Sequence, residues 1–368
     1  MKANFNRAAL SEVLGLLTFV VPSRTPKPIL QCLQITAGEK DVRICATDLE
    51  VGVNCLVCEV QVEQSGEIVV PADRLAAVVR ESTDDILLIE AEEGVCKITG
   101  ADSHFTIYGQ EAEQYPQVPE FEGAADIEIG LGNLQEGIEL CLFATAKEST
   151  RYALNGVLWE MKGKKLLLVA TDGRRLARSR VSLAASPSKE VTQTKIIVPA
   201  KAMGILDKIG GSDEDMVSIK LVDNQILMSC ANVVVSSNLV EGNFPKYEDI
   251  IPTDYDKKLT LSRDATLSAV RRAALLTSDE SRGIKLAVGD DRLVFSSRAP
   301  EAGDARIEMS IKYKGEPIEI GFNPQFLIDA LRVVREPEFE LEFGQQDRPG
   351  LMKSGQNFLY VLMPVSLG

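Results

Sequence analysis

The feature that most constrains the fold is a strand-then-helix unit that occurs three times along the 368 residues. Each copy has a short apolar run, a proline and then a segment with helical periodicity; the prolines are Pro71, Pro199 and Pro324. They lie 128 and 125 residues apart, about one third of the chain in each case. Proline suits the first turn of a helix, because the N–H that it lacks would have no helical partner there. A spacing this regular predicts three copies of one module.

Two further landmarks recur with the same spacing. Thr47-Asp48 and Thr171-Asp172 each end an apolar run and lie 124 residues apart, and the third copy has Ser297-Arg298 at the equivalent place. Segments 114–119 and 243–247, each with an aromatic residue before a proline, close the first and second copies. The copies tile the whole chain. We therefore expect three domains, at residues 1–124, 125–252 and 253–368.

Each copy is expected to hold two helices separated by runs of short strands. The first helices are predicted near residues 6–20, 133–147 and 263–277, and the second helices follow the three prolines. Between them the chain has alternating or continuous apolar residues, interrupted by turn-forming Gly, Asp and Asn. Only two helices in about 120 residues favour an α+β fold, with helices packed on antiparallel sheets.

Composition excludes several classes of protein. The formal net charge is −14, from 40 Lys and Arg against 54 Asp and Glu, which argues against a surface that grips nucleic acid all over. No apolar run approaches the ~18 residues of a membrane span, and the start lacks a signal pattern. Seven cysteines, an odd number without framework spacing, fit reduced thiols. We expect a cytoplasmic protein.

The predicted helices carry a different charge from the rest of the chain. Together the six helical windows sum to +2, which leaves −16 elsewhere, and only the last three windows are individually positive. A weakly basic surface within an acidic body would attract a polyanion to one place and hold its phosphates loosely and without sequence specificity. For any single helix, however, an ordinary solvated face is the simpler interpretation.

The last two helices show how basic residues would be displayed. In the fifth window Leu267, Val270 and Ala274 are predicted to form the buried stripe, with Arg272 pointing away from it and Arg271 at its border. In the sixth window the apolar residues leave Arg332 and Arg335 outside.

Four ordered blocks, together with the threefold repeat, resemble a known family. The blocks are residues 151–158, 170–177, 241–247 and 360–365, and Arg24 with Pro28-Ile29-Leu30 fits the same pattern. Over its entire length the chain is similar to the DNA polymerase III beta subunit family of bacteria, the sliding clamps. The resemblance implies the DNA-clamp (processivity) fold in three repeated domains, and a ring formed by a head-to-tail homodimer. Such a ring has twelve helices around the hole and encircles double-stranded DNA without sequence specificity.

The resemblance also implies partners and an absence of chemistry. The ring would tether the DNA polymerase III alpha subunit, be placed on DNA by a clamp-loader complex, and serve other clamp-binding polymerases and repair proteins. It would be a non-catalytic accessory subunit with no catalytic residues, cofactor or metal.

In this family, partner proteins dock a short peptide into an apolar cleft. Gly173 would allow a tight turn, Pro245 would form a wall, and Met363 would adapt to different ligands. Mapped onto this chain by motif, the cleft comprises Arg151, Leu154, Thr171, Gly173, Arg174, Arg175, Leu176, Pro245, Ile250, Asn323, Phe326, Val361, Met363, Pro364 and Val365. Without the matching blocks, core packing would be the preferred interpretation of the leucines and Val361.

The same resemblance, with the helix charges, predicts the residues that contact DNA. They are Arg24, Arg74, Arg80, Tyr152, Lys201, Arg271, Arg272, Arg332 and Arg335.

Other signals in the sequence are weak. Cys55 and Cys58 form a single C-x-x-C, and His104 is the only histidine, so a zinc site lacks ligands. Asp48 and Asp172 are best explained as turn-forming residues, because no base or nucleophile motif accompanies them. Two alternatives stay open: an enzyme built around these aspartates, and a repeat scaffold that binds proteins but never DNA.

Overall fold

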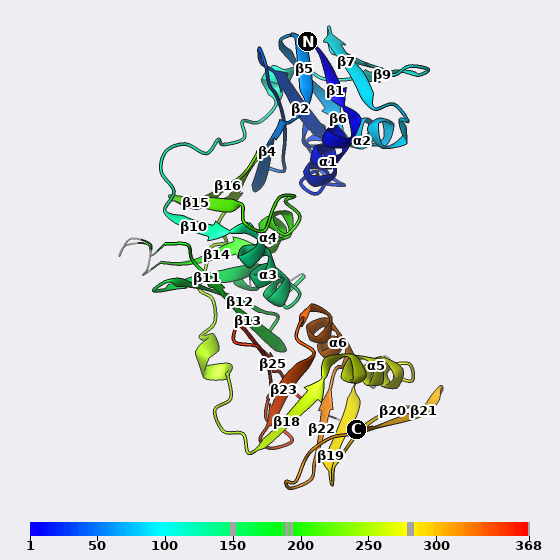
Figure 1. The fold of residues 1–368 in the computed structure, drawn as a ribbon, viewed down its shortest axis with the longest axis vertical. Coiled ribbons are helices and arrows are strands. Elements are labelled where there is room, and N and C mark those ends of the chain that lie inside the picture. Colours follow the sequence, from blue (N-terminus) through cyan, green and yellow to red (C-terminus); the bar gives the residue numbers. More distant parts are fainter. Residues whose placement is uncertain (148–151, 186, 188–190, 192–193, 278–282, 367–368) are drawn as a thin grey trace. The chain divides into compact units, whose positions relative to one another are not determined.

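The computed structural model describes residues 1–147, 152–185, 187, 191, 194–277 and 283–366 (Figure 1). Two compact units make up the chain. Unit 1 comprises Met1–Gln135, Leu183–Val191 and Lys201–Leu239, and unit 2 comprises Glu136–Ser182, Thr192–Ala200 and Val240–Gly368. The second repeat is therefore shared between the two units.

Unit 1 contains two antiparallel sheets. The first has the strand order β5-β1-β7-β8-β9, and its strands are β1 (Lys2–Asn6), β5 (Val60–Gln64), β7 (Ile86–Glu92), β8 (Val95–Thr99) and β9 (His104–Tyr108). The second has the order β10-β15-β16-β17-β4-β3-β2-β6, and its strands are β2 (Cys32–Ala37), β3 (Val42–Thr47), β4 (Val51–Val57), β6 (Gly66–Pro71), β10 (Ile127–Gly130), β15 (Met216–Val222), β16 (Gln225–Cys230) and β17 (Val233–Asn238).

Unit 2 repeats this plan. Its larger sheet has the order β14-β11-β12-β13-β25-β24-β23-β18, and its strands are β11 (Gly156–Lys162), β12 (Lys165–Thr171), β13 (Arg175–Ser182), β14 (Lys195–Pro199), β18 (Lys257–Ser262), β23 (Glu338–Phe343), β24 (Gly350–Ser354) and β25 (Phe358–Leu362). Its smaller sheet has the order β21-β20-β19-β22, and its strands are β19 (Ile284–Gly289), β20 (Arg292–Ala299), β21 (Gly303–Ser310) and β22 (Ile318–Phe322).

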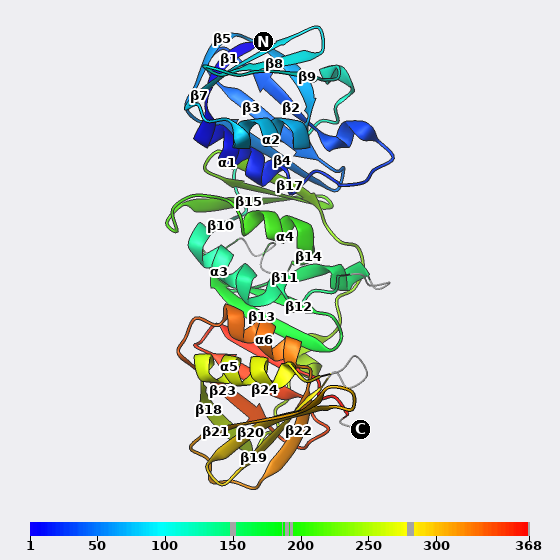
Figure 2. The same ribbon diagram turned by 90° about the vertical axis from the view of Figure 1, so that its right-hand side faces the viewer.

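Six α-helices accompany the sheets in the described residues. They are α1 (Arg7–Leu17), α2 (Ala72–Glu81), α3 (Leu131–Leu142), α4 (Ala200–Leu206), α5 (Arg263–Ala274) and α6 (Pro324–Val333). Helices α1 and α2 pack against each other in the first repeat, as α5 and α6 do in the third, where they lie side by side over strands of unit 2 (Figure 2). Short 3-10 helices η1 (Pro28–Gln31), η2 (Ala112–Gln114), η3 (Tyr152–Asn155) and η5 (Tyr247–Ile250) complete the elements used below.

The three prolines lie where the repeats predict. Pro71 is the residue before α2, Pro199 ends β14 immediately before α4, and Pro324 is the first residue of α6. At α6 the side chain of Asn323 accepts a hydrogen bond from the N–H of Gln325, at 2.9 Å, and so caps the helix. The predicted α+β plan of helix pairs on antiparallel sheets, repeated three times, is confirmed.

One predicted helix face was only partly right, because Val270 is the one residue of its three that is fully buried. The buried residues of α5 are Thr266, Ala269, Val270 and Ala273, whereas Leu267 and Ala274 are only half-buried. Thr266 tolerates burial because its hydroxyl donates to the Ser262 carbonyl at 2.7 Å. Small residues on this face fit the close contacts that α5 makes with α6, β20 and β21. Size and hydrogen bonding, rather than hydrophobicity alone, decide which face is buried.

Candidate functional site

The floor of the candidate site lies where β13 and β25 run side by side in unit 2 (Figure 1). Leu176 pairs directly with Val361, and both are 1 % exposed. The neighbouring Ser179 donates to the Gly137 carbonyl of α3, and Tyr360 to the Phe326 carbonyl of α6, so Ser179 and Tyr360 face the helices. Because side chains alternate along a strand, Leu176 and Val361 point to the opposite face of the sheet.

An apolar cluster extends this floor across the sheet. It comprises Leu158, Val169, Leu176, Ile197, Tyr247, Leu351, Leu359 and Val361. Phe244, Ile251 and Tyr255, from the segment that links the second and third repeats, pack against it and are partly buried. Over this cluster, the sheet face opposite the helices is thus apolar and partly covered by the chain's own linker.

A tight turn after β12 forms one side. The Thr171 hydroxyl donates to the Arg175 carbonyl at 2.6 Å and accepts from the Gly173 N–H at 3.1 Å. One Asp172 carboxylate oxygen accepts from the N–H groups of Arg174 and Arg175 at 2.9 and 3.0 Å. Gly173 has φ +86°, a conformation that glycine adopts at little cost. Asp172 thus acts as the predicted turn former, and the turn exposes backbone beside the floor.

The linker and the carboxyl-terminal tail supply the other sides. Ile250, in η5, is 38 % exposed and Met363 is 39 % exposed, while Pro245, Pro364 and Val365 are half-buried. Two backbone hydrogen bonds fix the tail: the Met363 N–H donates to the Arg174 carbonyl at 3.0 Å and the Val365 N–H to the Gly321 carbonyl at 2.9 Å. We define the docking patch as Leu154, Gly173, Leu176, Pro245, Ile250, Val361, Met363, Pro364 and Val365.

Arg175 is placed differently from the rest of the predicted cleft. Its guanidinium donates to the Asp172 carboxylate at 3.0 Å, the Asp329 carboxylate at 2.7 Å and the Phe143 carbonyl at 2.8 Å. It also lies over the rings of Phe326 and Phe143, 4.5 and 5.5 Å from their centroids. Burial opposes the charge, but Tyr360, Asp329 and Asp172 outweigh it and raise the pKa of Arg175.

These contacts bring together three elements behind the docking patch. Arg175 lies on the helix side of the sheet, because it alternates with Leu176. Phe326 serves as a surface for its guanidinium, and Asn323 is engaged as the cap of α6. Arg175 therefore lies behind the patch, whereas Asn323 and Phe326 stay predicted residues of the cleft border. Arg151, the remaining cleft residue predicted from sequence, lies outside the described residues.

The equivalent place in unit 1 has no such patch. Gly52 pairs with Ser236 in the same register in which Leu176 pairs with Val361. A methyl group added at Gly52 would come within 2.8 Å of both the Ser236 hydroxyl and a Val118 methyl, so the chain's own Val118 covers this site. Leu49, with φ +78°, stands where unit 2 has Gly173. Small and polar residues therefore replace the Leu176–Val361 floor at this place in unit 1.

The residues predicted to contact DNA are mostly exposed. The exposed members are Arg24, Arg74, Arg80, Tyr152, Arg271, Arg272, Arg332 and Arg335. Arg80 is 3.2 Å from the Glu81 carboxylate, and Arg335 is 2.7 Å from that of Glu139. These pairs are open to solvent, so they are weak and easily exchanged.

Lys201 alone is held inside the fold. It is half-buried, and its ammonium group donates to the Asp48 carboxylate and, at 2.7 Å, to the Val20 carbonyl. Lys201 of α4 thus joins the Thr-Asp turn of the first repeat to the chain after α1. In unit 2, Arg175 likewise joins the Thr-Asp turn, at Asp172, to the chain after α3, at Phe143.

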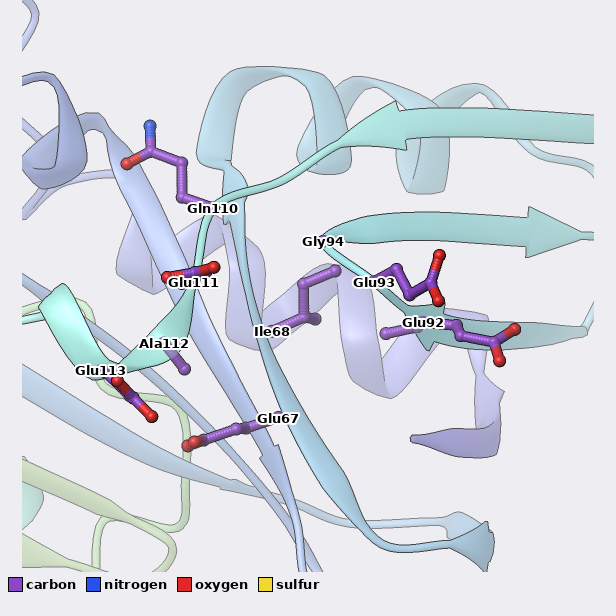
Figure 3. Close-up of a pocket in the computed structure, with 10 residues that line it drawn as sticks. Glu67, Ile68, Glu92, Glu93, Gly94, Gln110, Glu111, Ala112 and Glu113 are labelled. Carbon is purple, nitrogen blue, oxygen red and sulfur yellow. The ribbon is translucent and has the colours of Figure 1, made fainter.

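A separate pocket in unit 1 is acidic. Its volume is about 450 Å³, and Glu67, Glu92, Glu93, Glu111 and Glu113 contribute five carboxylates to its lining. Figure 3 shows the side chains of Glu92 and Glu93 pointing away from those of Glu111 and Glu113. Within the described part of the chain, no group of three or more such side chains is placed to hold a metal ion. The pocket would also repel a polyanion.

The remaining sequence signals are structural. The seven cysteines are free thiols; Cys55 is buried and Cys58 exposed. Asp48 accepts from the N–H groups of Glu50 and Val51 at 3.0 and 2.7 Å, as a turn former does. No helix among the described residues is long and apolar enough to cross a membrane.

Sequence reasoning missed several supporting residues. Asp329 and Phe143 hold Arg175, and Tyr247 takes part in the apolar cluster. The Phe-Pro-x-Tyr spacing at 244–247 signals an anchored linker, but nothing in the sequence pairs Asp329 with Arg175, because 154 residues separate them.

Comparison with known proteins identifies the family. Three sequence models of the DNA polymerase III beta subunit match this chain. The model of the N-terminal domain matches residues 1–119, that of the central domain 128–246 and that of the C-terminal domain 248–366. The beta sliding clamp of Pseudomonas putida is 32 % identical over all of both chains. The beta sliding clamp of Chlamydia pneumoniae is 30 % identical over all of this chain and 99 % of its own.

Solved structures agree over the full length. A sliding clamp from Pseudomonas aeruginosa bound to griselimycin has a TM-score of 0.92 and 31 % identity, and covers all of both chains. A griselimycin-bound clamp from Bartonella birtlesii has a TM-score of 0.91 and 31 % identity, again over all of both chains. With the three domain models covering nearly the whole chain, the chain belongs to the DNA polymerase III beta subunit family, the sliding clamps.

Proposed function

We propose that two copies of this chain close head to tail into a ring around duplex DNA and tether a polymerase to it. As a member of its family, the chain is a processivity factor and a non-catalytic accessory subunit of DNA polymerase III. The observation that carries the proposal is the presence of three family domains along one chain, with exposed arginines on helices of both units.

The exposed arginines would face the DNA. They lie on α2, α5 and α6, with Arg335 just after α6 and Arg24 in a loop, and the exposed Tyr152 lies in η3. Against a net charge of −14, a few solvated arginines attract phosphates without holding them tightly, so the duplex can slide. Lys201 would have to leave Asp48 and the Val20 carbonyl to reach a phosphate, so it contributes least.

Two sheet edges are suited to join the copies. Within the described residues, β9 pairs only with β8, and β21 pairs only with β20. The β9 edge exposes Phe105 and Tyr108, and Leu275 is 78 % exposed just after α5, which packs on β21. Pairing β9 of one copy with β21 of the other would satisfy both edges and close a ring of two.

The docking patch would receive a short peptide from each partner. These partners are the polymerase III alpha subunit, the clamp loader, and other polymerases and repair proteins of the cytoplasm. Buried Leu176 and Val361 give an apolar floor, while Ile250 and the flexible Met363 form adaptable sides.

Deletion of Met363–Gly368 tests the assignment of the patch. The shortened chain should keep its dimeric mass in solution but lose stimulation of polymerase III synthesis. The substitution Ile250→Ser should lower stimulation, whereas Val222→Ser, at an equally exposed position in unit 1, should not. Full stimulation by the shortened chain would show that the docking surface lies elsewhere.

A further inference from the structure

Glu160 is an unexpected residue beneath the linker. It lies on β11, and only 5 % of it is exposed, although carboxylates are rarely buried without partners. It pairs with Lys195 across the sheet, and their charged groups are 2.7 Å apart. Lys162 lies 3.3 Å away on the same strand. Both lysines are about half exposed, so neither explains why the carboxylate is buried.

The third partner of Glu160 comes from the linker. The hydroxyl of Tyr247 donates to the second Glu160 oxygen, while the Tyr247 ring belongs to the apolar cluster with Leu176 and Val361. Burial alone would raise the pKa of Glu160, but hydrogen bonds from Lys195 and Tyr247 outweigh it and lower the pKa. A charged acceptor makes the tyrosine hydrogen bond stronger than a neutral one.

Tyr247 is linked to the docking patch through η5. This 3-10 helix begins at Tyr247 and ends at Ile250. With three residues per turn, positions i and i+3 lie on the same side of such a helix. Tyr247 is 1 % exposed and Ile250 is 38 % exposed, so a single turn connects an anchored residue to an exposed side of the patch.

The linker between the first and second repeats is anchored differently, through Tyr115, whose hydroxyl donates to the Cys32 carbonyl rather than to a carboxylate. Two residues after its proline it has Val118, whereas the second linker has Tyr247 two residues after Pro245. Valine has no hydroxyl, and Val118 instead packs beside Gly52. The hydrogen bond to a buried carboxylate therefore occurs at this position only in the linker that carries the docking patch.

We propose that Glu160 and Tyr247 are positioning residues that hold η5 so that Ile250 forms a fixed side of the docking patch. This inference rests on the proposed peptide-docking function. Neither side chain needs to touch the peptide. Their effect is to spare the peptide the cost of ordering the linker when it binds.

A double-mutant cycle on peptide affinity tests the inference. The probe is a fluorescein-labelled peptide carrying the clamp-binding segment of the polymerase III alpha subunit from the same source, and fluorescence anisotropy gives its Kd. Tyr247→Phe and Glu160→Gln should each weaken binding about three- to tenfold. Ile250→Ala should weaken binding in the unmodified chain but change it less than about twofold in the Tyr247→Phe background.

The matched control is Tyr115→Phe in unit 1. Tyr115 is also buried and donates to a carbonyl, that of Cys32, at 3.0 Å. Its loss should lower stability, by less than the loss of the Tyr247 bond because the acceptor is neutral, and leave peptide affinity unchanged. Fluorescence of Trp159, buried in unit 2, reports whether the unit 2 variants are folded, and far-UV circular dichroism does so for Tyr115→Phe.

The outcomes separate the two proposals. If the unmodified chain does not bind the peptide, the proposed docking function is wrong and this inference fails with it. If it binds, and Ile250→Ala weakens binding while Tyr247→Phe and Glu160→Gln do not, the docking function stands and the positioning role is wrong. Losses from Tyr247→Phe and Ile250→Ala that simply multiply would also overturn the positioning role.

Discussion

Removing Arg175 should destabilise unit 2 more than any surface substitution. The Arg175 side chain is 10 % exposed and donates three hydrogen bonds, to two carboxylates and one carbonyl. Breaking a buried ion pair costs about 3–5 kcal/mol, because the remaining partner is left charged and buried. Here the two partner carboxylates keep other hydrogen bonds and some contact with water, so the expected cost lies near the lower end of this range.

Both carboxylates that pair with Arg175 have other hydrogen-bond donors. Asp329 still accepts from Gln325 at 2.6 Å, and Asp172 from two backbone N–H groups. Both carboxylates are about one fifth exposed, so water reaches them. We expect Arg175→Ala to lower the free energy of unfolding by about 3 kcal/mol. Arg175→Lys should lose about half of that, because an ammonium group cannot replace the planar guanidinium across three acceptors.

Urea unfolding followed by Trp159 fluorescence measures this loss. Trp159 is the only tryptophan and is fully buried in unit 2. The control is Lys285→Ala, whose exposed pair with Glu319 should contribute less than about 1 kcal/mol. If Arg175→Ala cost no more than Lys285→Ala, the view that Arg175 joins β13, α6 and the chain after α3 would be refuted.

Two further predictions concern pH and backbone strain. Because the folded state lowers the pKa of Glu160, this residue contributes stability above its ordinary pKa of 4.5, and the contribution is lost as pH falls through the lowered value. Acid titration of the unfolding free energy should therefore fall less steeply below pH 4.5 for Glu160→Gln than for the unmodified chain; parallel curves would show that Glu160 is not stabilised in the fold. At the turns, Gly173→Ala should cost about 1 kcal/mol, because it places a side chain at φ +86°, and Leu49→Gly, at φ +78°, should gain up to about 1 kcal/mol. Thermal unfolding of both variants checks the signs, and a loss on Leu49→Gly would contradict the assigned strain.

The repeated plan could be predicted because it depends on local signals. Pro71, Pro199 and Pro324 mark helix starts that backbone chemistry alone favours, and Asp48 and Asp172 form turns with their nearest neighbours. The patch residues are predicted from matching blocks of sequence rather than from physical patterns. From the sequence alone, Leu176 cannot be distinguished from a core leucine, because only its pairing with Val361 places it in the patch.

The rest depends on contacts between distant parts of the chain. Lys201 was predicted to face DNA, but Asp48, 153 residues away, holds its ammonium group. The pairing of Glu160 with Tyr247 spans 87 residues and requires the linker's path over the sheet. Hydrophobic periodicity in α5 predicts Leu267 as buried, whereas Ala269 and Ala273 are the buried residues of a helix that packs on α6, β20 and β21. Sequence patterns do not contain such partners.

The central claim is that DNA is held by encirclement, and retention on circular duplex tests it most directly. Labelled protein loaded onto a nicked plasmid by the clamp loader should co-elute with the circle in gel filtration at a salt concentration that screens phosphate contacts. A single cut in the plasmid should then release it, because a ring slides off an open end. Equal retention on circular and linear DNA, or equal loss from both, would contradict the account.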